Sequence, residues 1–102
     1  MESQIAVFGA VRFPPGRVKD VVPHLKMMVE ATRRLDGCIS YDAAEDLFEP
    51  GLLRISELWA DLASLQWHTQ APHIAAWHEA CRVCGMLDKR YTVWAATPTA
   101  LR

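Results

Sequence analysis

Between Leu52 and Trp77 the spacing of apolar positions along the chain changes twice. Up to Trp59, apolar and polar residues alternate with a period of two, which is typical of a β-strand. After Asp61 the apolar positions recur at helical spacing, and the Asp61 carboxylate suits an N-cap because it can accept backbone N–H groups of the first turn. Pro72 ends this helix, since the residue before a proline is disfavoured in the α region. A second helix can begin with that proline in its first turn.

The rest of the chain adds three strands and one helix to this stretch. The predicted elements are a strand over 4–13, a helix over 17–35 stopped by Gly37, a strand over 38–47 that forms a hairpin with the strand after Gly51, a late helix from 72 to about 87 and a last strand over 90–96. Their order is the ferredoxin-like β-α-β-β-α-β pattern with a broken second helix. We therefore predict a single α+β domain over residues 1–102.

The first predicted strand is apolar on both faces, with Val7 and Val11 on one and Ala6 and Phe8 on the other. In a ferredoxin-like fold the helices cover one face of the sheet, and Trp94 of the last strand extends the uncovered face. An uncovered apolar face of this size is usually an interface. A second copy related by two-fold symmetry is the simplest cover. We predict a homodimer.

Composition narrows the class of protein further. Of the 102 residues, 51% are hydrophobic and 23% charged, and the net charge is −1, so the chain is globular and lacks the basic patch of a nucleic-acid-binding protein. No apolar run approaches the roughly 20 residues of a membrane span. The N-terminus lacks the positively charged region of a signal peptide, and we predict a cytoplasmic protein that contacts neither nucleic acid nor membrane.

The Cys81-x-x-Cys84 spacing resembles a redox or metal-binding pair. A reactive pair of this kind lies at a helix N-terminus, where the helix dipole lowers the thiol pKa, whereas this pair lies late in a predicted helix. His78 shares the helical face, but no second cluster completes a zinc site. We expect buried, reduced thiols and no metal.

Three motifs, in this order and spacing, resemble the antibiotic biosynthesis monooxygenase family: Gly-Cys-Ile-Ser-Tyr at 37–41, Glu-Leu-Trp-Ala-Asp at 57–61 and His-Thr-Gln-Ala-Pro-His at 68–73. The resemblance implies a dimeric α+β barrel, in which two ferredoxin-like sheets pack face to face, with a pocket in each subunit between sheet and helices. Many members oxidise hydroquinones or polyphenols with O₂ and no cofactor. The resemblance thus implies a small aromatic substrate, O₂ and no cofactor. Other branches degrade haem or isomerise a phosphorylated signalling sugar.

The haem-degrading branch relies on an Asn in the first strand and on a Trp and a His of the late helices. In this chain His78 falls at the position of that His, His68 falls where the Trp would be, and no Asn occurs at all. This argues against haem degradation and leaves haem binding open.

His68 and His73 are the candidate catalytic residues, on either side of the predicted helix break. A helix break can turn side chains into a pocket, and a neutral imidazole there can act as a general base. The alternative is that each histidine satisfies a helix end. The sequence does not decide which of the two faces a ligand.

Five further residues are candidate substrate contacts: Tyr41, Glu57, Trp59, Trp77 and His78. Glu57 shares a strand face with core residues, so its carboxylate needs a partner or a raised pKa, and it serves as a base, as a substrate hydrogen-bond acceptor or as a structural contact. Trp67 is expected in the core together with Trp59 and Trp77, and one of the three can stack on a flat substrate. His78 is expected at the core or the pocket wall.

The sequence favours a cofactor-independent monooxygenase in which a pocket histidine removes a phenolic proton. One alternative is a dimeric barrel that binds an apolar ligand, haem included, without turnover. Another is a cofactor-free isomerase, which needs an anionic substrate; residues 68–77 contain no Lys or Arg to bind a phosphate.

Overall fold

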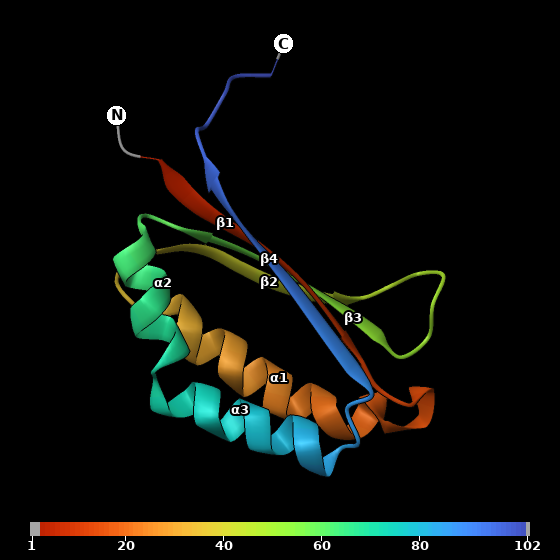
Figure 1. The fold of residues 1–102 in the computed structure, drawn as a ribbon. Coiled ribbons are helices and arrows are strands. Elements are labelled where there is room, and N and C mark those ends of the chain that lie inside the picture. Colours follow the sequence, from red (N-terminus) through yellow and green to blue (C-terminus); the bar gives the residue numbers. More distant parts are fainter. Residues whose placement is uncertain (1–2, 102) are drawn as a thin grey trace.

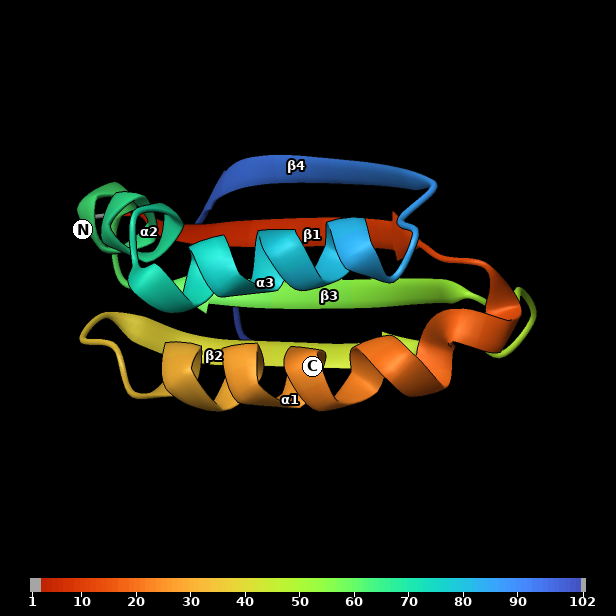
Figure 2. The same ribbon diagram turned by 90° about the horizontal axis from the view of Figure 1, so that it is seen from below.

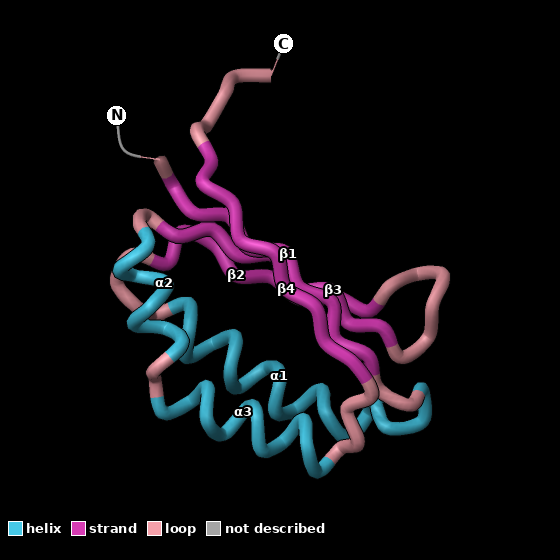
Figure 3. Tube along the Cα trace, in the orientation of Figure 1, coloured by secondary structure: helices cyan, strands magenta, loops and turns pink. Residues whose placement is uncertain are grey.

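The computed structural model describes residues 3–101 and contains the predicted order of elements (Figures 1 and 3). The elements are β1 (Gln4–Arg12), a 3-10 turn (Pro15–Arg17), α1 (Val18–Arg33), β2 (Cys38–Glu45), β3 (Leu52–Trp59), α2 (Leu62–Thr69), α3 (Pro72–Val83) and β4 (Asp88–Ala96). This confirms the ferredoxin-like α+β fold with a broken second helix.

The four strands form one antiparallel sheet in the order β2-β3-β1-β4, and the helices lie on one of its faces (Figure 2). In Figure 2 the helices lie in front of the sheet: α1 runs along β2, α3 runs across β1 and β3, and β4 lies outside the area that either helix covers. Almost every residue of β4 is accordingly exposed on both faces of the strand. The sheet therefore has an uncovered face and an uncovered edge.

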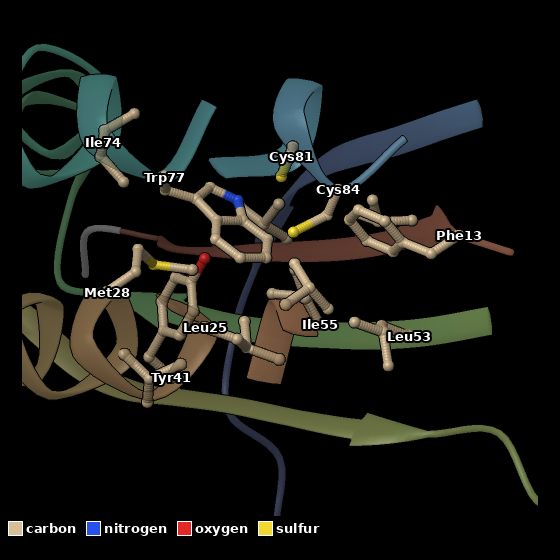
Figure 4. Packing of buried hydrophobic residues seen from close by; sticks show 14 of the residues in the cluster. Phe13, Leu25, Met28, Tyr41, Leu53, Ile55, Ile74, Trp77, Cys81 and Cys84 are labelled. Atoms are coloured by element: carbon tan, nitrogen blue, oxygen red, sulfur yellow. The ribbon is translucent and has the colours of Figure 1, made fainter. Parts of the chain in front are cut away.

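Alternation along β1 and β3 builds the core on the helix side of the sheet. Val7 and Val11 of β1 are 3% and 1% exposed, and β3 places Leu53, Ile55 and Trp59 beside them, each no more than 2% exposed. Figure 4 shows these strands meeting side chains of α1 and α3 in one continuous cluster. The period-two interpretation of both strands is confirmed.

On the opposite face, apolar side chains form a row across three strands. Ala6 of β1 pairs with Leu58 of β3 and with Trp94 of β4, and Phe8 lies in the next row on the same face. Phe8 is 56% exposed and Trp94 57% exposed. We call these four residues the open-face cluster. It confirms that β1 is apolar on both faces and that the helices cover only one of them.

The break between α2 and α3 follows the predicted capping chemistry. The Asp61 carboxylate accepts a hydrogen bond from the Ser64 backbone N–H at 2.8 Å, which starts α2. Ala71 is extended, with φ −70° and ψ 146°, as expected before a proline, and Pro72 occupies the first turn of α3.

The late helix ends earlier than the predicted residue 87. Gly85, with φ 79°, donates its N–H to the Arg82 carbonyl at 3.2 Å, and Met86 donates to the Cys81 carbonyl at 3.0 Å. These two bonds form a Schellman motif, which needs a residue in the left-handed region and stops α3 at Val83. Val83 and Leu87, which lie on either side of this helix end, are 58% and 64% exposed.

Two other apolar residues are more exposed than the sequence pattern indicated. Trp67 is 75% exposed, because α2 directs Leu65 and His68 toward the sheet and places Trp67 on its solvent side. The expectation of a core Trp67 was therefore wrong. Ile39 is 49% exposed at a register shift between Cys38 and Ser40 of β2, so it does not share the buried face with Tyr41.

Candidate active site

A pocket of about 240 Å³ lies between the sheet and the α2–α3 pair. Five of the seven residues proposed from the sequence line it: Tyr41, Glu57, His68, Trp77 and His78. The two others, Trp59 and His73, lie behind this wall and are described below. The pocket is where a ferredoxin-like fold with a helix-covered face can enclose a ligand between its two layers.

His68 lies in the last turn of α2 and is 5% exposed. Its ring centroid lies 4.9 Å from that of Trp59 and 5.5 Å from that of Tyr41, so two aromatic side chains fix its orientation. The Nδ1 atom is enclosed and has no hydrogen-bond partner in the described part of the chain. The Nε2 atom lies 4.0 Å from Oε1 of Glu57, which is beyond hydrogen-bonding distance but within reach of strong Coulomb attraction.

Glu57 is 6% exposed and extends from the centre of β3 toward His68. Its Oε1 accepts a hydrogen bond from the indole Nε1 of Trp59 at 2.9 Å. Burial raises the pKa of Glu57, whereas the indole hydrogen bond lowers it by stabilising the ionised form. Trp59, which is fully buried, therefore supports both His68 and Glu57 from behind and does not line the pocket.

Burial, with a smaller contribution from the neighbouring His73 and His78, lowers the pKa of His68 to about 4. The imidazole is therefore neutral at neutral pH. A neutral imidazole beside a carboxylate can accept a proton from a ligand, and the carboxylate then stabilises the imidazolium that forms. This is the chemistry that the arrangement of His68 and Glu57 makes available.

His73 lies in the first turn of α3, and its Nε2 is 3.0 Å from the hydroxyl oxygen of Thr32 in α1. Thr32 is fully buried, so this hydrogen bond joins the two long helices inside the protein. The ring centroids of His73 and His68 are 6.0 Å apart, and His73 lines a separate crevice between α1 and α3. The geometry of His73 fits the structural alternative better than a role as base.

Three pocket residues of β4 were not among the sequence candidates: Lys89, Tyr91 and Val93. They are alternate residues of β4 that pair with the helix-covered side of β1. Their alternation predicts a strand, but only the position of β4 next to β1 places them in the pocket. Lys89 also changes the argument against an anionic ligand, because the pocket has a cation although residues 68–77 contain none.

Gly9 of β1 allows Tyr91 to form part of the pocket wall. Tyr91 pairs with Gly9 across the sheet, and a Cβ at position 9 would overlap the Tyr91 ring. Burial of the ring edge raises the pKa of the Tyr91 hydroxyl. The glycine is thus required by the close approach of a side chain and not by its own backbone conformation.

We expect Gly9→Ala to destabilise the protein by about 1–3 kcal/mol, because the added methyl group forces Tyr91 out of its position. Urea denaturation measures the free energy of unfolding. In a Tyr91→Ala background the same Gly9→Ala change should cost little, because the clashing ring is gone. An equal loss of stability in both backgrounds would show that Tyr91 is not the reason for the glycine.

None of the three cysteine thiols lines the pocket at His68. Cys81 and Cys84 are each 3% exposed, Cys38 is half-buried, and all three are reduced. Burial raises the pKa of Cys81 to about 11, which leaves it a neutral core thiol at neutral pH. Among residues 3–101, no three His, Cys, Asp or Glu side chains come together in a way that could hold a metal ion. In the same part of the chain, none of the helices has the length and apolar character needed to cross a membrane.

The fold and the site define an α+β protein with a small-molecule pocket between its sheet and its helices. The chain matches the sequence model of the antibiotic biosynthesis monooxygenase family over residues 4–80, and it belongs to this family. Family membership supports an enzyme of the monooxygenase type that binds a small molecule.

Similar structures cover nearly the whole chain. A protein of Deinococcus radiodurans assigned to the same family has a TM-score of 0.90 at 24% identity, covering 96% of this chain and 97% of its own. Rv0793 from Mycobacterium tuberculosis has a TM-score of 0.84 at 26% identity, covering 97% and 100%. An uncharacterized Synechocystis sp. protein, sll1783, is 29% identical over 72 residues, which are 71% of this chain and 49% of that protein. The chain thus spans about half of this relative.

Proposed function

We propose that this protein is a cofactor-independent monooxygenase that oxidises a small hydroquinone-like aromatic with O₂, with His68 as the base. The observation that carries the proposal is the pairing of a buried, neutral His68 with Glu57 on the wall of an otherwise largely apolar pocket. In this pocket Val7, Leu65 and Trp77 contact the ring of the substrate, and Tyr41 offers a hydroxyl to a substrate oxygen.

The first step is transfer of a phenolic proton to Nε2 of His68. A phenol has an ordinary pKa near ~10, so the buried imidazole of His68, with a pKa of about 4, is by itself a weak base for it. An ionised Glu57, whose Oε1 lies 4.0 Å from Nε2, stabilises the positive charge that develops on the imidazole while the proton is transferred. His68 therefore needs Glu57, and Trp59 holds the carboxylate in place.

The second step is reduction of O₂ by the bound anion. One electron passes from the phenolate to O₂, and the resulting radical and superoxide combine to form a C–O bond at a ring carbon that carries hydrogen. Loss of water then leaves one atom of O₂ in a quinone product. The apolar pocket walls keep the two radicals together and exclude bulk water.

We also propose that two copies pack through their open-face clusters to form a dimeric α+β barrel. The exposed Phe8 and Trp94 and the uncovered position of β4 support this arrangement. The cytoplasmic location stays a prediction from the sequence.

The direct test of the proposed activity is oxygen uptake by the purified protein with a panel of hydroquinones, corrected for autoxidation in buffer. We expect one O₂ consumed per substrate and one ¹⁸O atom in the product from ¹⁸O₂. Catalase should leave the stoichiometry unchanged. Stoichiometric hydrogen peroxide would identify an oxidase instead, and absence of uptake with every hydroquinone would favour the non-catalytic binding protein.

A further inference from the structure

A second cavity of about 260 Å³ adjoins the candidate active site. Four residues line both cavities: Trp77, His78, Lys89 and Tyr91. Beyond them the second cavity is closed by apolar and sulfur-containing side chains, among them Val11 and Met86. The site is thus a pocket with an inner lobe at His68, an outer lobe toward the end of α3, and a shared middle section.

The sheet register gives the direction and length of this pocket. Glu57 and Val93 both pair with Val7, so they mark the inner lobe, whereas Lys89 pairs with Val11. Lys89 therefore lies four residues along β4 from Val93, which is about 13 Å between backbone positions. Part of this distance is spanned by the lysine side chain, which reaches both lobes. The spacing between the two backbone positions leaves room for a ring between a group bound by Lys89 and the reacting end of a ligand.

In the part of the chain that the structure describes, the pocket contains one cationic side chain, Lys89 of β4, and one buried acid, Glu57 of β3, and the two form no ion pair. Within residues 3–101, Lys89 is the one Lys or Arg that lines either lobe, and it takes part in none of the ion pairs of that region. Glu57 lines only the inner lobe, where it faces His68. The neighbours Asp88 and Arg90 lie on the opposite face of β4 and line a separate cavity there. Lys89 is therefore available for an anionic group of a ligand.

We propose that the substrate is a hydroquinone of at least two fused rings with a carboxylate on the ring remote from the reacting hydroxyl, which Lys89 binds. The hydroquinone ring lies in the inner lobe at His68, and the second ring passes between Trp77 and Tyr91. This inference rests on the proposed function, because that function identifies the inner lobe as the reacting end. The inference adds a specificity-determining residue and a substrate class to the proposed function.

The test compares two compounds that differ only in charge, 5,8-dihydroxynaphthalene-2-carboxylate and its carboxamide. We expect the parent to prefer the carboxylate in kcat/KM by roughly tenfold, because a charged hydrogen bond at a half-open site is worth on the order of 1.4 kcal/mol. Lys89→Met should lose this preference and keep its activity with the carboxamide. Lys19→Met, which changes an exposed lysine outside both lobes, should behave like the parent.

Anaerobic binding of both compounds, followed by calorimetry, separates this inference from the proposed function. A parent that binds the carboxylate more tightly, loses this preference in Lys89→Met and consumes no O₂ would support the ligand class and refute the oxygenase. A parent that oxidises both compounds equally would support the oxygenase and overturn the role of Lys89. Equal loss of both activities in Lys89→Met would also overturn it, since it would indicate a structural role.

Discussion

Replacement of His68 by glutamine is expected to lower the rate of hydroquinone oxidation by about 10²–10⁴-fold, the usual contribution of a general base. Glutamine keeps the approximate volume of the side chain but cannot accept a proton from a phenol. The rate is measured as oxygen uptake per enzyme at saturating substrate. Circular dichroism should show that the fold is retained, because His68 packs at the end of a short helix and not within the strands.

His73→Gln is the matched control, since His73 is the other histidine at the helix break. It should lose stability, because the buried hydrogen bond between the Thr32 hydroxyl and His73 is lost and only the weak contact with the Met28 sulfur remains, at a cost of about 1–3 kcal/mol. Its rate with hydroquinone should remain within a few-fold of the parent. If His73→Gln is inactive and His68→Gln is not, the roles proposed for the two histidines are reversed. If both variants are fully active, neither histidine is the base.

The pH dependence of the parent should differ from that of an exposed histidine. Because burial lowers the pKa of His68 to about 4, the neutral base is fully present above about pH 6, and the rate should fall only below about pH 5. An exposed histidine as the base would instead give a midpoint near ~6.5.

The free energy of unfolding also depends on the protonation of His68. The unfolded chain binds a proton at His68 near pH 6.5 and the folded chain only near 4, so acidification through this interval favours unfolding. Glu57 acts in the opposite sense, because its raised pKa stabilises the folded state below its unfolded pKa, and this stability is lost as pH rises through the folded value. Urea denaturation of the parent and of His68→Gln at pH 7 and pH 5 measures the free energy of unfolding. The parent should lose more stability than His68→Gln between the two pH values, and this difference is the contribution of His68.

Phe8→Asp is expected to convert a dimer into a monomer at micromolar protein concentration. Phe8 lies in the open-face cluster, and a carboxylate buried there without a partner costs several kcal/mol per subunit. Sedimentation velocity measures the change directly. The monomer should also unfold at lower urea concentration, because the apolar face of β1 and β4 becomes solvated.

Leu47→Asp makes the same chemical change at a residue that is 92% exposed in the loop between β2 and β3. This control should remain dimeric. A parent protein that sediments as a stable monomer would refute the barrel. A Phe8→Asp variant that remains fully dimeric would instead locate the interface elsewhere.

Much of the candidate site could be predicted because its residues lie on elements with clear periodicity. The alternation of β3 places Glu57 on the helix-covered face, and the helical spacing after Asp61 places His68 one turn beyond Leu65 on the inner side of α2. Both are local properties of a single element. The same spacing could not show that Trp67 lies on the outer side, because a large apolar residue next to a turn fits either side of a short helix.

By itself, the sequence determined the order of the elements, the break at Pro72 and the second apolar face of β1, since each depends on residues within a few positions of one another. The tertiary structure decided which histidine faces the pocket, because His73 points to Thr32 on α1, 41 residues away in sequence. It also decided that β4 brings Lys89 and Tyr91 to the active site. Periodicity reports which side of an element is apolar, whereas the element that packs against that side is chosen by contacts between distant parts of the chain.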